Sequence, residues 1–397
     1  MPISIAEARE RVLAAARPLP AERICVTDAL DRVLAAEVSA AGDVPPFPCS
    51  AMDGYALVAG PADRELRVVG ESRAGTPSGQ TLKYGEALRI STGAAVPAGA
   101  TAVIRQEDVE MRDGTITTRS ATAPGENVRH AGEDMPAGTT VLPAGTRLHP
   151  AELGAAVAAG VGEVTVARRP HVQVLCTGDE LRDPGEPLGP GEIHNSNAPM
   201  LVSLSKRCGA DAPAAKRLVD DRAATESALR EALAESDAIV ISGGVSVGPH
   251  DHVKPALAAL GVDERFWRVA LQPGGPTWFG TKGDKLVFGL PGNPVSAFVT
   301  FALFARPALL VLQGASPEPL TSSQAVLAAA VKRNREREQA VRVRLRRRNG
   351  SILALPNGPQ GSHIVTSLLG ADALALIPAG EGEVAAGTTV ALAELPR

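Results

Sequence analysis

The sequence predicts a multidomain fold of the α/β plus β class, with a central doubly wound α/β domain that carries a glycine-rich phosphate loop. Three observations support this prediction. Between residues 170 and 312, strand patterns alternate with helical patterns, and repeated β-α-β order produces a mostly parallel sheet covered on both faces. The apolar run 237–241 leads directly into the glycine-rich segment 242–251. The flanking segments contain short alternating strands separated by glycine and proline, which indicates small β-rich domains.

Taken in order, the chain divides into four expected regions. Residues 3–16 have apolar side chains at helical spacing, and the composition changes at Gly42 to short strands and many turns. Helical patterning returns near residue 151, so the β-rich segment is interpreted as an insertion. The expected regions are an elongated helical and β linker domain at 1–41 and 139–169, an inserted β-rich domain at 42–138, the α/β domain at 170–315, and a small C-terminal β-barrel at 316–397.

Composition and charge limit the classes of function. A chain of 397 residues is too long for one ordinary core. The formal charge of −4 argues against general nucleic-acid binding, because no strong positive field offsets phosphate repulsion. The cysteines at 25, 49, 176 and 208 form no CxxC pair, which argues against a disulfide framework or a zinc ribbon and favours a cytoplasmic location.

Two segments bear on targeting and membrane insertion. The N-terminal segment contains Glu7 and Glu10 and lacks the basic and then apolar pattern of a secretory signal. The most apolar stretch, 295–312, is interrupted by Arg306 and Pro307, so it is predicted to be a buried helix rather than a membrane span. No membrane insertion is expected.

Four polar or glycine-rich motifs follow predicted strands. In the segment 242–251, glycines at 243, 244 and 248 allow backbone N–H groups to converge on a phosphate, and a helix beginning near His250 would add its positive end. One such turn is as often structural as functional. Its companions, however, also lie at strand exits, where α/β sheets bind their ligands. They are the segment 176–181, the pair Asp220 and Asp221, and the segment 290–294.

The acidic residues among these motifs suggest a metal. Glu180, Asp220 and Asp251 would surround a phosphate, and carboxylates beside a phosphate repel it unless a cation lies between them. Mg²⁺ is the expected cation because it binds a few carboxylates together with substrate oxygens. The reaction class expected from the residues is phosphoryl or pyrophosphate-linkage chemistry.

Other motifs have a structural interpretation that is favoured when each is taken alone. Asp53-Gly54 is typical of a turn, although a carboxylate there is well placed to hold a metal or a proton. The loop around Thr92 and the turn around Asp134 are also typical of structural or solvated segments. Cys176 ends an apolar strand and is expected to be a core thiol. The arginine cluster at 335–348 is typical of a solvated strand face, from which one or two members could bind an oxyanion.

Five segments together resemble one family. They are 50–56 (SAMDGYA), 177–181 (TGDEL), 242–248 (SGGVSVG), 290–296 (LPGNPVS) and 361–363 (GSH). In this order they resemble the signature of the molybdopterin molybdenumtransferases, the MoeA and gephyrin E-domain family, over the whole chain. The resemblance implies a four-part elongated subunit, a molybdopterin-binding domain at 170–315, and a homodimer whose active site is shared between subunits. It also implies Mg²⁺-dependent insertion of molybdate into adenylated molybdopterin with release of AMP.

The resemblance also implies roles for individual residues. The loop 243–248 would bind phosphate, Asp251 with Asp53 or Glu180 would hold Mg²⁺, and Arg268 and Arg342 would steer molybdate. The residues implied for catalysis are Asp53, Glu180, Asp220, Asp251, Arg268 and Arg342. Those implied for binding are Thr92, Asp134, Thr177, Gly178, Gly243, Gly244, Ser246, Gly248, Pro291, Gly292, Asn293, Pro294 and Ser362.

One segment departs from the family pattern. Where many members carry Lys-Pro-Gly-Lys-Pro, this chain has Gln272 and Gly275 in place of the two lysines. Each missing charge is worth about 1–3 kcal/mol in a partly desolvated site. Molybdate affinity would therefore fall unless arginines substitute, and Arg268 just upstream keeps one basic position.

Two alternative functions remain open at this point. A weakened member of the family could act as a gephyrin-like protein-binding scaffold, although the acidic positions 53, 180, 220 and 251 argue against it. The other alternative is a molybdopterin adenylyltransferase, against which the extra domains and the segment 50–56 argue. A separate adenylyltransferase is instead a possible partner that donates the adenylated pterin.

Overall fold

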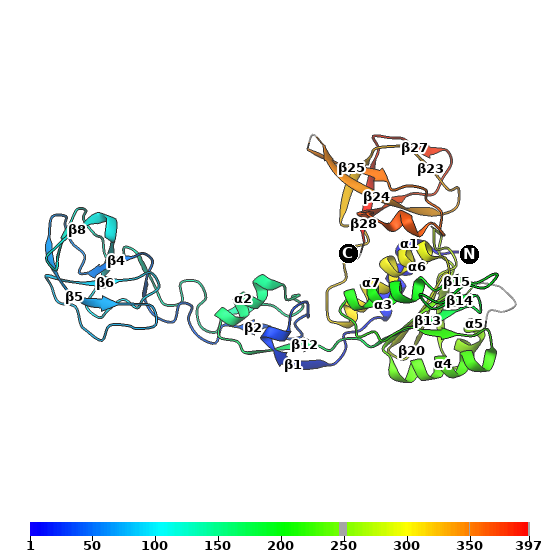
Figure 1. The fold of residues 1–397 in the computed structure, drawn as a ribbon, viewed down its shortest axis with the longest axis horizontal. Helices are drawn as coiled ribbons and strands as arrows, with labels where there is room; N and C mark the ends of the chain where they lie inside the picture. The colour runs from blue at the N-terminus through cyan, green and yellow to red at the C-terminus, as the bar shows by residue number, and fades with distance from the viewer. Residues whose placement is uncertain (246–251, 349, 396–397) are drawn as a thin grey trace. The chain divides into compact units, whose positions relative to one another are not determined.

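The computed structural model describes residues 1–245, 252–348 and 350–395. The chain forms two compact units (Figure 1). Unit 1 comprises Met1–Glu22, Asp31–Ala35 and Val166–Arg397, and unit 2 comprises Arg23–Leu30 and Ala36–Thr165. The predicted division into four regions is finer than these two units and stays a prediction.

A six-stranded sheet forms the centre of unit 1. Its order is β16 (Lys216–Leu218), β13 (Val172–Thr177), β17 (Ala238–Ser242), β21 (Lys285–Leu290), β20 (Trp278–Lys282) and β18 (Asp263–Trp267). The first four strands are parallel, and β20 is antiparallel to both of its neighbours. Every residue of β17 is buried, as expected for a strand of a parallel sheet covered on both faces.

Helices cover both faces of this sheet (Figure 1). On one face, Val174 packs in a core with α1 (Ile5–Ala15), α3 (Asn197–Arg207), α6 (Pro294–Thr300) and α7 (Arg306–Leu312). On the other face, the next residue, Leu175, packs with α4 (Arg222–Glu235) and α5 (Val253–Ala259). Because successive side chains of a strand point to opposite faces, this division confirms the predicted doubly covered α/β arrangement.

The most apolar stretch of the chain is a buried helix. Pro294–Leu312 is long and apolar enough to cross a membrane by length and composition, but 89% of its most apolar 18-residue window is buried inside the protein. It lies in the main core of unit 1 with α1 and α3. The interpretation of this stretch as a core helix is therefore confirmed.

Pro307 interrupts the hydrogen bonding of this helix. A proline has no N–H group, so it cannot donate to the carbonyl four residues earlier, which here belongs to Leu303. The preceding turn, η3 (Phe301–Ala305), is π-helical. Arg9 of α1 satisfies the Leu303 carbonyl at 3.0 Å and also donates to the carbonyl of Glu318 at 2.6 Å. Arg9 thus joins α1 and the interrupted helix to the segment that leads into the C-terminal strands.

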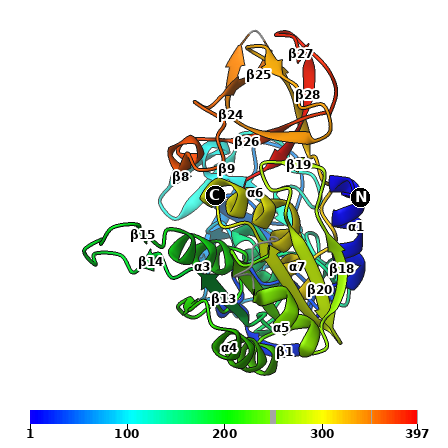
Figure 2. The same cartoon turned by 90° about the vertical axis from the view of Figure 1, so that its right-hand side faces the viewer.

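Five strands close into a barrel at the C-terminal end. They are β22 (Ser323–Leu327), β24 (Glu338–Arg348), β25 (Ser351–Pro356), β26 (Ala373–Ile377) and β28 (Thr389–Glu394). Most of them are labelled in Figure 2. The ring runs β24-β25-β22-β28-β26 and returns to β24. Val343, Ile377 and Val390 belong to its core. The predicted C-terminal β-barrel is confirmed, and β19 (Leu271–Gln272) adds to it by pairing with the start of β24.

Unit 2 is built mainly of strands. Its six-stranded sheet has the order β7 (Ala102–Arg105), β4 (Gly54–Leu57), β6 (Glu86–Ile90), β5 (Glu65–Ser72), β9 (Thr115–Thr118) and β8 (Val109–Arg112). Gly54 is required because a Cβ at this position would overlap with the Ile104 carbonyl of β7. The unit also contains α2 (Pro150–Ala158), β2 (Val38–Ser39), β3 (Cys49–Ser50), β10 (Val128–Arg129) and β11 (Thr140–Leu142).

The remaining elements are short. They are β1 (Ala21–Cys25), η1 (Val26–Asp28), η2 (Gln106–Asp108), β12 (Glu163–Ala167), β14 (Leu181–Arg182), β15 (Ile193–His194), β23 (Val331–Lys332), η4 (Val365–Leu368) and β27 (Glu383–Val384).

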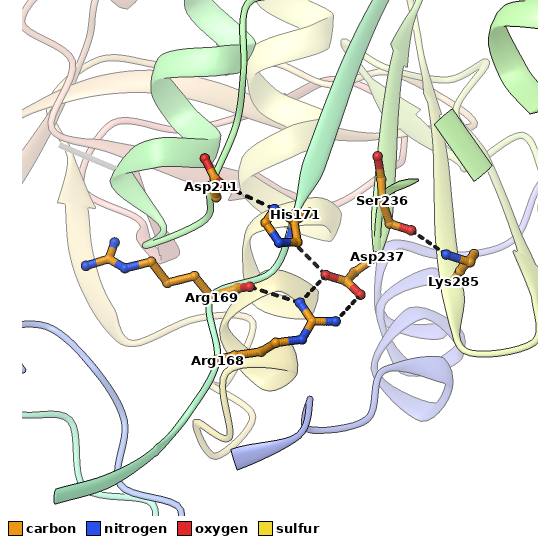
Figure 3. Close-up of polar contacts among 7 residues, drawn as sticks. All are labelled: Arg168, Arg169, His171, Asp211, Ser236, Asp237 and Lys285. Carbon is orange, nitrogen blue, oxygen red and sulfur yellow. Dashed lines mark hydrogen bonds and ion pairs between the residues drawn. The ribbon is translucent and has the colours of Figure 1, made fainter. Parts of the chain in front are cut away.

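A polar network ties together the amino ends of the central strands (Figure 3). Both carboxylate oxygens of Asp237, just before β17, accept hydrogen bonds of 2.7 Å from Arg168. The amide of His171, just before β13, also donates to Asp237 at 2.8 Å. Burial alone would raise the pKa of Asp237, but the hydrogen bonds from Arg168 and His171 outweigh it, so the pKa is lowered.

We predict that Asp237→Asn lowers the free energy of unfolding of unit 1 by about 2 kcal/mol at pH 7, because a charge-assisted pair is lost. Because the pKa of Asp237 is lowered in the folded state, its ionised carboxylate stabilises the fold at pH values above the unfolded-state pKa of about 3.9. This stabilisation is lost as the pH falls through the folded-state pKa. The difference between wild type and variant should therefore shrink below about pH 4. Denaturation followed by tryptophan fluorescence measures this, because Trp267 and Trp278 both lie in unit 1. Asp211→Asn, which removes an exposed contact to His171, is the control; equal losses would contradict the prediction.

We predict that Arg9→Met destabilises unit 1 by about 1–3 kcal/mol, because the Leu303 carbonyl that Pro307 leaves unpaired would lose its donor. Arg11→Met on the same helix removes a half-exposed pair with Glu7 and an exposed hydrogen bond to the Arg265 carbonyl, and should cost less than about 1 kcal/mol. The same fluorescence measurement compares the two variants. Similar losses for both would show that Arg9 contributes no more than a surface arginine.

Candidate active site

A cavity of about 420 Å³ lies at the carboxyl edge of the central sheet. Because β13, β17 and β21 are parallel, their carboxyl ends meet at this edge. The cavity is lined by five residues that were predicted to belong to the site, namely Thr177, Glu180, Gly292, Asn293 and Pro294. Ser242, which begins the predicted glycine-rich segment, also lines it, together with residues that the sequence did not single out, namely His194, Asn195, Ser196 and Asn197. Polar residues at a helix start, such as those before α3, are a signal that could have identified them.

The glycines after β17 allow the chain to pass close to β13. Gly243 and Gly244 have φ angles of 86° and 66°. Added Cβ atoms would lie 2.7 and 3.0 Å from the Thr177 hydroxyl. The Gly243 amide donates to the Leu290 carbonyl at 3.0 Å, so the expectation that it is a free phosphate donor is wrong.

The structure describes only the start of the predicted phosphate loop. Ser246, Gly248 and Asp251, for which phosphate or metal binding was expected, lie outside the described residues. Gly178 is described and has a φ of 144° beside Glu180, so the loop after β13 also needs a glycine at this position.

Of the acidic residues that were predicted to surround a phosphate and that the structure describes, only Glu180 lines the cavity. Glu180 lines the cavity, whereas Asp220 follows β16 and its amide donates to the Asp179 carboxylate at 3.1 Å. Asp221 caps α4 by accepting from the Ala224 amide. Within residues 1–245, 252–348 and 350–395, no group of three or more His, Cys, Asp or Glu residues is placed to hold a metal ion. Of the predicted metal ligands, Asp53 belongs to unit 2 and Asp251 is not described.

Cys176 lines the cavity as a neutral thiol. It is 1% exposed, and burial raises its pKa to about 11. A cysteine nucleophile requires the opposite shift. The interpretation of Cys176 as a core thiol is therefore confirmed.

The barrel contributes one predicted residue to this edge. The side-chain amide of Asn293 donates to the Ser362 hydroxyl at 3.1 Å, and the Val295 amide donates to the Ser362 carbonyl at 3.1 Å. The loop that contains Ser362 thus contacts the turn before α6. Pro294 is the first residue of that helix, a position where its missing N–H costs nothing, and Pro291 directly follows β21.

Arg342 is buried rather than available to an anion. It is 1% exposed, and its guanidinium donates to the Ser367 hydroxyl and the Gly361 carbonyl at 3.3 and 3.4 Å. Burial lowers its pKa to about 10, so it stays protonated at neutral pH. The expectation that Arg342 approaches molybdate directly is wrong in this structure. Arg342 instead holds the backbone next to Ser362.

Arg268, which was expected to steer molybdate, directly follows β18 and is exposed. Its guanidinium carbon lies 4.4 Å from the centre of the Trp267 ring. The ammonium of Lys254 lies 3.7 Å from the centre of the same ring, which gives a second cation that the sequence did not single out. The Trp267 indole N–H donates to the Val245 carbonyl at 3.2 Å, so both cations lie near the start of the glycine-rich segment.

The two positions that depart from the lysine pattern contact one turn of the chain. The side-chain nitrogen of Asn334 donates a hydrogen bond to the Gln272 side-chain oxygen at 2.7 Å. The side-chain oxygen of Asn334 accepts one from the backbone amide of Arg337 at 3.0 Å. A Cβ added to Gly275 would lie 3.7 Å from the Arg337 guanidinium. Arg337 therefore places a positive charge beside Gly275.

Asp53 and Thr92 come together in unit 2. One Asp53 oxygen accepts from the Thr92 amide at 2.7 Å and from the Thr92 hydroxyl at 3.1 Å. The backbone hydrogen bond is the main reason that the pKa of Asp53 is lowered. Asp134 lines a separate cavity of about 480 Å³ with Val44, Pro45, Cys49, Arg129 and Glu133.

Comparison with known proteins identifies the family. The matching family models are the MoeA N-terminal region (domain I and II) at residues 3–160, a probable molybdopterin binding domain at 173–311, and the MoeA C-terminal region (domain IV) at 324–395. The molybdopterin molybdenumtransferase 2 of Mycobacterium tuberculosis is 38% identical over 397 residues, which cover 97% of this chain and 96% of the relative. The chain belongs to the MoeA family.

Further relatives agree with this membership. The molybdopterin molybdenumtransferase of Haemophilus influenzae is 34% identical to this MoeA-family chain over 383 residues, with 94% of each chain covered. The crystal structure of a molybdopterin biosynthesis MoeA protein from Pyrococcus horikoshii matches with a TM-score of 0.82 at 31% identity, with 100% of both chains covered. The resemblance inferred from the five sequence motifs is confirmed over the whole chain.

Proposed function

We propose that this protein is a molybdopterin molybdenumtransferase that acts in molybdenum cofactor biosynthesis. It inserts molybdate into adenylated molybdopterin and releases AMP. The observation that carries this proposal is the match along the full chain to relatives of that name, together with a polar cavity where family motifs from three strand ends meet. The adenylyltransferase alternative is disfavoured because the match includes the N- and C-terminal regions as well as the molybdopterin-binding domain.

We further propose that Glu180 and Asp53 act on the same substrate, as in a homodimer whose site is shared between subunits. Asp53 is an ionised carboxylate because its pKa is lowered, and Glu180 lines the cavity. Mg²⁺ is proposed as the cation that would offset these charges beside the substrate phosphates. The described residues of one chain do not assemble a metal site by themselves, which agrees with ligands drawn from separate parts of the protein. A separate adenylyltransferase is proposed to deliver the adenylated pterin.

We predict that the purified protein releases AMP from adenylated molybdopterin with Mg²⁺, and that this release depends on molybdate. Glu180→Ala and Asp53→Ala should each reduce the rate by about a hundredfold or more, because each removes a carboxylate from the reacting site. Glu226→Ala, on the outer helix α4 where it pairs with Arg230, is the control and should leave the rate unchanged. Consumption of ATP with formation of pyrophosphate would instead indicate the adenylyltransferase. Tight substrate binding without turnover would indicate the scaffold.

We also propose that Arg337 supplies positive charge for molybdate where the lysines are absent. Its side chain lies beside Gly275, and no carboxylate pairs with it among the residues that the structure describes. A glycine at 275 leaves room for this guanidinium. Gln272 accepts a hydrogen bond from the side chain of Asn334, and Asn334 in turn accepts one from the backbone amide of Arg337. Gln272 thus helps to hold the turn that contains Arg337.

We predict that Arg337→Ala raises the molybdate concentration for half-maximal AMP release by about tenfold, which corresponds to about 1.4 kcal/mol for one lost charged contact. The maximal rate should change much less, because the charge acts mainly on binding of the dianion. Arg335→Ala, two residues away, removes an exposed arginine that lies 3.6 Å from Glu381 and serves as the control. Equal molybdate requirements for the two variants would contradict the role of Arg337.

A further inference from the structure

An apolar groove lies on unit 1 beside the candidate active site. It is a cavity of about 630 Å³, lined by residues of α3 and α6 and by the segment 365–372, which lies between β25 and β26 in the chain. Ser196 lines both this groove and the cavity at the strand ends. The apolar side chains of the groove are those of Met200, Phe298, Val365, Leu368, Leu369 and Leu395.

Two of these side chains are open to water. Val365 is 43% exposed and Leu369 is 67% exposed. They lie four residues apart, at the start of η4 and just after its end. Large aliphatic side chains that are exposed together leave apolar surface in water, and such patches with polar rims mark interaction sites. The groove is therefore suited to apolar side chains of another molecule.

A row of arginines lies along β24. Arg344, Arg346 and Arg348 occupy alternate positions, so they share one face of the strand and follow each other at intervals of about 7 Å. All three are exposed. The residues between them point the other way, and Val343 and Leu345 pack in the barrel core. Among the residues that the structure describes, no carboxylate forms an ion pair with these three, which are called the arginine row.

The groove and the arginine row form one continuous surface. The guanidinium of Arg344 donates to the Leu369 carbonyl at 3.4 Å, and Leu369 lines the groove. A Cβ added to Gly370, which also lines the groove, would lie 3.1 Å from the same guanidinium. The row therefore begins at the rim of the groove with Arg344, and Arg346 and Arg348 lie successively farther along β24.

The charge and shape of this surface select among possible occupants. A second copy of the chain is disfavoured, because a two-fold interface through this face would bring two arginine rows together. Single-stranded nucleic acid is disfavoured, because the aromatic ring of the groove, Phe298, packs against the core of unit 1 instead of standing free for stacking. A lipid surface favours a projecting apolar face, whereas these side chains line a cavity.

We propose that this surface binds an acidic segment of another protein. Apolar side chains of that segment enter the groove, and its carboxylates pair with the arginine row, because a guanidinium can bind a carboxylate through two parallel hydrogen bonds. In an extended segment, acidic residues at alternate positions repeat at the spacing of the arginines. The inference concerns a protein partner, so it goes beyond the proposed function and does not depend on it.

The test is the fluorescence anisotropy of a fluorescein-labelled synthetic peptide mixed with the full-length protein. One half of the peptide contains leucines, the other half contains glutamates at alternate positions, and both orders of the two halves are measured. Matched peptides have lysines in place of the glutamates or serines in place of the leucines. We expect the leucine and glutamate peptide to bind saturably and more weakly as salt is added, and both matched peptides to bind at least about tenfold more weakly. Absence of saturable binding in both orders, or equal binding of a matched peptide, would overturn the proposal.

Two pairs of variants locate the binding on this surface. Arg346→Glu replaces an attraction by a repulsion and should weaken binding of the leucine and glutamate peptide by about tenfold. Arg347→Glu makes the same change on the opposite face of β24 and should stay within about threefold of wild type. Leu369→Ser should weaken binding by about fivefold, whereas Leu188→Ser, at an exposed leucine that does not line the groove, should leave it unchanged. Equal losses within either pair would contradict the assignment.

The outcome can be read even where a variant is unstable. All four positions are exposed, and thermal unfolding shows whether each variant is folded. If a charge-reversed variant does not fold, Arg346→Gln and Arg347→Gln replace the pair, and the comparison of the peptides on the wild-type protein needs no variant. A single-stranded DNA oligonucleotide and vesicles that contain phosphatidylglycerol are measured beside the peptide. Tighter binding of either one, reduced by Arg346→Glu and not by Arg347→Glu, would overturn the choice of an acidic protein as the occupant.

Discussion

Parallel pairing of β13, β17 and β21 is the constraint on which the candidate site depends. In a parallel sheet the carboxyl ends of neighbouring strands lie at one edge, so Thr177, Ser242 and Gly292 meet there although more than a hundred residues separate the first from the last. Asn197 then joins two of these strand exits through Ser242 and Gly292.

Two buried arginines use their guanidinium groups to donate hydrogen bonds to backbone carbonyls. Arg9 donates to the backbone carbonyls of Leu303 and Glu318. The Leu303 carbonyl needs this donor because Pro307, four residues later, has no N–H group. Arg342 donates to a hydroxyl and a backbone carbonyl next to Ser362. A planar group with five donors suits irregular backbone that lacks its own partners. Both arginines thus stabilise segments that connect the α/β layers with the barrel.

The exposed cations serve a different purpose. Arg268 and Lys254 lie against the Trp267 ring, and Arg337 lies beside Gly275. These charges lie beside Trp267 and Gly275 instead of forming the paired lysines expected from the family pattern. Because a cation–π contact leaves the charge accessible to solvent, Arg268 and Lys254 can still attract anions.

The sequence by itself determined the order of elements, the buried apolar helix, the C-terminal barrel and the family, because these depend on local periodicity and on motifs that are contiguous in the chain. It also identified Thr177, Glu180 and the segment 290–294 as neighbours at one edge. Only the tertiary structure decided that Arg342 is buried, that the Gly243 amide is already bonded, and that Asn197 Oδ1 has no hydrogen-bond partner among the residues that the structure describes. Burial and hydrogen bonding depend on residues far apart in the chain, so no local pattern reports them.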